Sequence, residues 1–206
     1  NEGVDGKKFN KDVETSILKK YSLPDKYFFY PAQLWKHKNH LTLLYAINFL
    51  KKKNKIVNLV LTGEEYAYNN EVTKYIEKER LNNVFYLGKV NFEELLALYI
   101  NSHYVIAGAL YESSSLTIYE AAVMGVPILA SKIPCHVEQS RDYDVKFFEP
   151  EDYIKLAEIF EFLFYKESQI ARKRIIENNQ IVVNQNSWEN IAKLYIKKFR
   201  EIYDTR

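Results

Sequence analysis

The chain has 206 residues, of which 47% are hydrophobic, and its 29 basic and 27 acidic residues leave a net charge of +2. This composition predicts a folded protein with one sizeable core and argues against a disordered chain or a nucleic-acid-binding protein. The single cysteine, Cys135, excludes an internal disulfide. Because no apolar run approaches ~18 residues and residues 1–15 lack a signal-peptide core, we expect a cytoplasmic protein without a transmembrane segment.

Short apolar runs alternate with amphipathic segments through the first three quarters of the chain. In order, they predict a strand at 26–31, a helix from 39, a strand at 56–61, a helix at 70–81, a strand at 84–88, a helix at 92–99, a strand at 104–107, a helix across 112–120, and strands at 126–130 and 145–148. Strands that alternate with helices at this spacing predict an α/β fold, a Rossmann-like doubly wound parallel sheet.

The remainder of the chain is predicted to be helical. Apolar residues follow helical spacing from Leu156 to Phe164, and a final helix is predicted from Ser187, a good N-cap. We expect this last helix to pack back on the domain. The predicted organisation is a linker segment at 1–25, the doubly wound domain at 26–186 and the C-terminal helix at 187–206.

Two glutamates, Glu112 and Glu120, flank the region where the fourth strand passes into a helix. Hydroxyl residues follow Glu112, and the unpaired N–H groups and dipole at a helix start favour an anion there. Glu120 is expected about 7 Å along that helix, which suits the distance from a diphosphate to the ribose and the sugar that it joins. Since carboxylates accept hydrogen bonds from sugar hydroxyls, the segment predicts a nucleotide-sugar site.

The spacing of these glutamates, followed by 120–131, resembles the E-x7-E signature of retaining glycosyltransferases of the GT-B fold, family four. Further segments resemble the same family in the same order: 1–9, 31–40, 83–88 and 187–189. The resemblance implies one Rossmann-like half of a GT-B enzyme with extra C-terminal helices. It makes 26–186 the donor-binding domain and directs the C-terminal helix either onto this domain or toward an N-terminal domain.

The resemblance also implies an activity. A nucleoside-diphosphate sugar would donate its glycosyl group, without a metal or other cofactor and with retained configuration, to a glycan or lipid-linked acceptor. The acceptor would be held by an N-terminal domain that this chain lacks, so the chain alone is expected to be inactive. Surface polysaccharide or lipopolysaccharide assembly, at the inner face of the membrane in the full-length protein, is the expected setting.

Site roles follow from the same resemblance. Lys38 is expected to neutralise the leaving nucleoside diphosphate and Glu112 to hold hydroxyls of the transferred sugar, and these two are the predicted catalytic residues. Glu120 is expected to hold the ribose. Gln33 stands where the family usually has an arginine, so half of the usual diphosphate clamp is absent. The other predicted donor-binding residues are Gly63, Val90, Ser113, Ser114, Ser115, Leu116 and Thr117.

Three other classes of protein share parts of this pattern. A GT-B nucleotide-sugar epimerase is the enzymatic one. A receiver-like regulatory domain would need an acidic cluster at its strand ends, where this chain has Gln33, Gly63 and Gly88. An oxidoreductase that binds a dinucleotide would need G-x-G-x-x-G after the first strand, which is absent. His37 and His40 lack acidic companions at ligand spacing, so no metal site is predicted.

Overall fold

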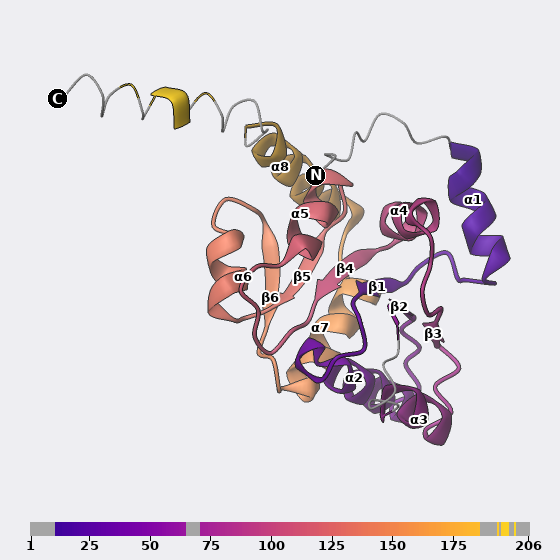
Figure 1. Ribbon diagram of the computed structural model, residues 1–206. Coiled ribbons are helices and arrows are strands. Elements are labelled where there is room, and N and C mark those ends of the chain that lie inside the picture. Colours follow the sequence, from indigo (N-terminus) through magenta and orange to yellow (C-terminus); the bar gives the residue numbers. More distant parts are fainter. Residues whose placement is uncertain (1–10, 65–70, 186–192, 194, 198–199, 201–206) are drawn as a thin grey trace.

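The computed structural model describes residues 11–64, 71–185, 193, 195–197 and 200. Within them, a parallel sheet of six strands has the order β3-β2-β1-β4-β5-β6 (Figure 1). The strands are β1 (Phe28–Pro31), β2 (Leu59–Thr62), β3 (Val84–Tyr86), β4 (Tyr104–Ala107), β5 (Ile128–Ser131) and β6 (Val145–Phe148). All the predicted strands are present, and the predicted doubly wound α/β fold is confirmed.

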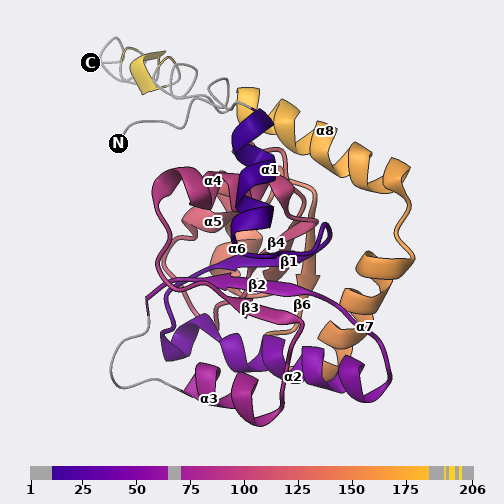
Figure 2. The ribbon, with the colours of Figure 1, turned by 90° about the vertical axis from the view of Figure 1, so that its right-hand side faces the viewer.

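Helices cover both faces of this sheet (Figure 2). One face carries α2 (His40–Lys52), α3 (Glu71–Lys78) and α7 (Tyr153–Tyr165), and the other carries α1 (Lys11–Lys20), α4 (Phe92–Asn101), α5 (Leu116–Val123) and α8 (Gln169–Gln185). Two short helices, η2 (Lys36–Lys38) and α6 (Pro134–Gln139), follow β1 and β5. None of the described helices is long and apolar enough to cross a membrane.

The central strand β1 shows why the strands appear as unbroken apolar runs in the sequence. Phe28 and Tyr30 lie in the core beneath α2 and α7, whereas Phe29 points to the other face and meets the ring of Tyr99 edge-on at 5.2 Å. All three are at most 2% exposed. Since both faces of a parallel sheet are covered by helices, its strands need apolar side chains at every position.

Two α-helices were not predicted, namely α1 and α6, whereas α8 lies in the part of the chain after residue 150 that was predicted to be helical. Helix α1 lies inside the predicted linker segment and packs on α4, where Ile17 is buried. The predicted final helix from Ser187 begins outside the described residues. Nearer the described end of the chain, Tyr195 is helical and 63% exposed.

The helix predicted across 112–120 begins later, at Leu116, with Ser115 as its N-cap residue. Glu112 therefore lies in the loop after β4 and not on the helix. The physical reason is that groups of this loop form contacts with other segments of the chain. The Glu112 carboxylate contacts two other segments, and the Ser115 backbone N–H donates to Gln139 Oε1 at 2.8 Å.

The strand order places one crossover point at the centre of the sheet. β1 lies between β2 and β4, so the chain winds from β1 outward to β3 on one side and from β4 outward to β6 on the other. The loops that leave β1 and β4 thus diverge at the carboxyl edge, which is where open α/β sheets bind ligands.

Candidate functional site

The two predicted catalytic residues meet at this crossover point. Lys38 ends η2, after β1, and Glu112 lies in the loop after β4. Lys38 Nζ forms an ion pair with Glu112 Oε1, and the two side chains are 22% and 8% exposed. A cation and a carboxylate are thereby held together across the divergence of two neighbouring loops.

The backbone around Lys38 is fixed by groups from three directions. The Tyr30 hydroxyl donates to the Lys38 carbonyl at 2.6 Å, and the Leu110 N–H donates to the His37 carbonyl at 2.7 Å. The next residue, Asn39, has left-handed backbone dihedrals, and its side-chain amide donates to the Pro150 carbonyl at 2.6 Å. These bonds fix the backbone from which the Lys38 side chain extends to Glu112.

A third side chain, His136, completes the arrangement and was missed by the sequence analysis. Its ring is fully buried, with Nε2 lying 3.1 Å from Glu112 Oε2. On the other side of the ring, Nδ1 lies 2.9 Å from the Ser131 carbonyl oxygen. The indication in the sequence was its position, because α6 begins at Pro134 directly after β5 and brings His136 to a third strand end.

These contacts determine the charge of Glu112. Burial raises the pKa of its carboxyl, but hydrogen bonds from His136 and Lys38, with the charge of Lys38, outweigh burial and lower that pKa to about 2. Glu112 is therefore a carboxylate at neutral pH. Burial and the nearby Glu112 charge raise the pKa of Tyr30 well above its usual value, so its hydroxyl stays protonated and donates to the loop of Lys38.

Part of the segment between the two glutamates is exposed to solvent. Ser113 and Ser114 are exposed, and Gln139 Nε2 donates to Ser114 Oγ at 3.0 Å. Leu116, the first residue of α5, is 68% exposed, whereas Ser115 is buried. The first turn of α5 thus opens beside the Lys38–Glu112 pair, where predicted donor-binding residues were placed.

Glu120 lies one turn into α5 and is not a free surface charge. Its Oε2 accepts a hydrogen bond from the Tyr99 hydroxyl at 2.5 Å. Burial, followed by the charge of Glu120, raises the pKa of Tyr99 well above its usual value, while a hydrogen bond with Thr117 has the opposite effect. A neutral phenol therefore orients this second carboxylate.

The ends of β2 and β3 are joined through the backbone. Gly63, at φ +125°, donates its N–H to the Gly88 carbonyl at 2.9 Å. A Cβ on Gly63 would lie 2.3 Å from the Ala32 carbonyl oxygen, so the turn requires glycine. Val90, in the loop after β3, is partly buried and packs against the core on the α4 side of the sheet.

Gln33, which follows β1, contacts the turn after β2. Its Oε1 accepts the Glu64 backbone N–H at 2.5 Å. The Glu64 carboxylate in turn pairs with Lys89 at 2.8 Å, and both of these side chains are well exposed. Gln33 thus braces the loop after β2, which explains a glutamine here without any ligand contact.

Neither histidine of the loop after β1 lies in a metal-like cluster. His37 stacks on Tyr111 with ring centroids 5.2 Å apart, and burial lowers the pKa of His40 to about 4, so that its ring is neutral. Among residues that the structure describes, no three His, Cys, Asp or Glu side chains gather where they could hold a metal ion.

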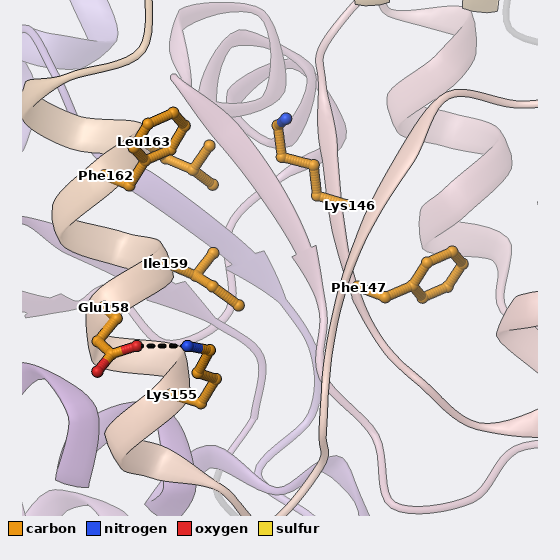
Figure 3. Close-up of a pocket in the computed structure, with 7 residues that line it drawn as sticks. All are labelled: Lys146, Phe147, Lys155, Glu158, Ile159, Phe162 and Leu163. Atoms are coloured by element: carbon orange, nitrogen blue, oxygen red, sulfur yellow. Dashed lines mark hydrogen bonds and ion pairs between the residues drawn. The ribbon is translucent and has the colours of Figure 1, made fainter.

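A hollow of about 430 Å³ lies elsewhere, between β6 and α7 (Figure 3). It is lined by Lys146, Phe147, Lys155, Glu158, Ile159, Phe162 and Leu163. Lys155 and Glu158 pair with each other at 2.6 Å, and none of the predicted site residues lines it. The crossover point, where the predicted site residues lie, therefore remains the candidate site.

Comparisons with solved structures agree with this fold. The chain is similar to a glycosyltransferase from Rickettsia africae (21% identity, 98% of this chain and 55% of that one, TM-score 0.83). It is also similar to Anabaena HepE in complex with UDP and glucose (20% identity, 89% of this chain and 50% of that one, TM-score 0.73). The chain thus spans about half the length of these structures.

A third structure, the C-terminal domain of the group 1 glycosyl transferase LpcC from Francisella tularensis, is matched almost whole. Identity is 19%, the match covers 89% of this chain and 98% of that one, and the TM-score is 0.71. The fold is therefore that of a GT-B C-terminal domain. No curated protein sequence matches the chain. The family model for glycosyl transferases group 1 matches residues 14–182, and the chain belongs to that family.

Proposed function

We propose that this chain is the donor-binding domain of a retaining glycosyltransferase that uses a nucleoside-diphosphate sugar. The observation that carries the proposal is the Lys38–Glu112 pair at the crossover point of the sheet. A cation suits the diphosphate and a carboxylate suits the sugar, so one pair of side chains meets both parts of such a donor.

Each residue of the pair has a distinct chemical part in this proposal. Negative charge develops on the leaving nucleoside diphosphate, and the pre-placed Lys38 ammonium would stabilise it. Glu112, which is ionised at neutral pH, would accept hydrogen bonds from hydroxyls of the sugar. Positive charge develops on the sugar as the glycosidic bond breaks, so these contacts count most in the transition state.

Support also comes from the relatives. The Anabaena protein was solved with UDP and glucose, and the family is one of glycosyl transferases. By this similarity, transfer would retain configuration without a metal and would act on a glycan or lipid-linked acceptor bound to an N-terminal domain. Polysaccharide assembly at the cytoplasmic face of the membrane is the setting that we propose.

The direct test is calorimetry of this chain with UDP, GDP, ADP and dTDP. We expect one of them to bind, and no glycosyl transfer by residues 1–206 alone, because the acceptor is assigned to the other domain. A folded sample that binds none of the four would contradict the proposal.

Substitution of the two glutamates separates their roles. Glu120→Ala should weaken nucleoside, diphosphate and sugar nucleotide alike, by ~1–3 kcal/mol if a ribose hydrogen bond is lost. Glu112→Ala should weaken only the intact sugar nucleotide, since the bare diphosphate has no sugar for it to hold. Titration of both variants with all three ligands is the measurement, and identical profiles would refute the assignment.

A further inference from the structure

In the proposed function, Lys38 must change partners when a donor binds. In this structure its ammonium is paired with Glu112, yet in the proposed function the same ammonium faces the diphosphate. The Glu112 side chain is only 8% exposed, so water replaces a departing partner poorly. A largely buried carboxylate that loses its cation is strongly destabilised, and this would oppose donor binding.

His136 contacts the other oxygen of the same carboxylate. Its Nε2 lies 3.1 Å from Glu112 Oε2, whereas Lys38 is on Oε1. The two contacts do not compete for one atom, so Lys38 leaves without disturbing the contact to His136.

The ring of His136 is held from behind by the end of β5. Nδ1 lies 2.9 Å from the Ser131 carbonyl oxygen and 3.1 Å from its hydroxyl oxygen, and that hydroxyl donates to the Ala109 carbonyl at 2.6 Å. Ala109 and Glu112 belong to the same loop. His136 is therefore anchored to the end of β5 and to the loop of Glu112 without any contact from the Lys38 side chain.

The atoms that surround the ring are mostly hydrogen-bond acceptors. A carbonyl oxygen and an ionised carboxylate only accept, and the Ser131 hydroxyl has already donated its hydrogen to Ala109. The ring is thus held between acceptor atoms of Ser131 on one side and Glu112 Oε2 on the other. Glu112 then retains its contact with His136 on Oε2 after Lys38 has moved.

We propose that His136 is a positioning residue that holds the Glu112 carboxylate in place through its contact with Oε2 while Lys38 turns to the diphosphate of the donor. This inference rests on the proposed function. It predicts that His136 strengthens diphosphate binding although it never touches the ligand.

A double-mutant cycle tests the proposal, with His136→Asn, Glu112→Gln and the pair together titrated with UDP, GDP, ADP and dTDP. His136→Asn is too short to reach Glu112 and should weaken diphosphate binding roughly tenfold, the lower end for a charge-assisted hydrogen bond. In the Glu112→Gln background no carboxylate remains to be held in place, so His136→Asn should have no effect. Val137→Ala, an exposed position on the same helix, is the matched control and should leave binding unchanged.

A role in packing alone gives a different result. The same loss in both backgrounds, or no loss in either, would overturn the proposal. Should His136→Asn fail to fold, His136→Phe keeps the ring volume and runs the same cycle.

A second readout needs no ligand. With ¹³C-labelled glutamate, the Glu112 carboxyl should be ionised at pH 4.5 in the wild type, whose Glu112 pKa is lowered to about 2, and partly protonated in His136→Asn. An unchanged resonance would overturn the contact itself. A wild type that binds no diphosphate but shows this shift would refute the proposed function, and with it the exchange of partners by Lys38, while leaving the His136–Glu112 contact established.

Discussion

The two sides of the carboxyl edge of the sheet are built from different groups. At the ends of β1, β4 and β5, charged side chains meet, and Lys38, Glu112 and His136 form one connected network. At the ends of β2 and β3, glycine backbone provides the contact, with Gly63 bonded to Gly88. One edge of the sheet thus combines a network of charged side chains with a turn that only glycine can form.

The backbone region should be the most sensitive to a single added atom. In Gly63→Ala the new Cβ meets the Ala32 carbonyl oxygen at 2.3 Å, at a φ of +125°. Overpacking and backbone strain together should destabilise the fold by roughly 2–5 kcal/mol. Urea denaturation measures it. Gly88→Ala is the matched control, because nothing lies within 4 Å of its Cβ and only strain of ~1–2 kcal/mol remains. Equal losses of stability in both variants would show that the close contact at Gly63 adds no cost.

In the charged region, Lys38→Ala should lower the affinity for the nucleoside diphosphate by ~1.5–3 kcal/mol, about tenfold to a hundredfold. The free nucleoside carries no phosphate, so its binding should hardly change. Calorimetry with both ligands is the measurement. If both weaken equally, Lys38 has a structural role and the assignment to the diphosphate is wrong.

Acid should remove the stability that the ionised Glu112 contributes to the fold. The folded pKa of Glu112 is about 2, below its ordinary 4.5, so the unfolded chain binds this proton first. The stabilisation is complete above pH 4.5 and is lost as the pH falls toward 2. From pH 6 to 3, the free energy of unfolding of the wild type relative to Glu112→Gln should fall by on the order of 1–2 kcal/mol, since solvent reaches part of the pair. A difference that is constant with pH would contradict this.

The smallest effect is expected for the exposed ion pair between Lys89 and Glu64. These side chains are 76% and 39% exposed. Lys89→Ala should therefore change stability by no more than ~0.5 kcal/mol and leave diphosphate binding unchanged. A loss of binding like that of Lys38→Ala would show that charge matters on both sides of the edge.

The fold was predictable wherever burial was complete. Leu59–Thr62 is buried at every position, and such strands stand out as apolar runs. Helix α8 lies in the part of the chain that was predicted to be helical, but its bounds were not predicted because it buries little of its surface, with Ile175 its principal buried apolar residue. Without a wide apolar stripe, helical periodicity carries little information.

Candidate site residues could be proposed from the sequence where a residue's chemistry is local to its motif. Lys38 and Glu112 were predicted separately, and the structure brings them together. The contact between His136 and Glu112 was not predictable, because it joins loops from separate strands and depends on the sheet order. The start of α5 was also misplaced, since the bond from the Ser115 N–H to Gln139 is a tertiary contact.

Gln33 bears on protein engineering. A designer who aligns this chain with its family would be tempted to install the usual arginine at position 33 in order to complete the diphosphate clamp. Arginine has no acceptor atom, however, so the Glu64 N–H that now donates to Gln33 would lose its partner. The consensus residue would gain a charge at the edge and loosen the turn that Gly63 shapes. The hydrogen bond between Gln33 and Glu64 thus argues against installing arginine at this position.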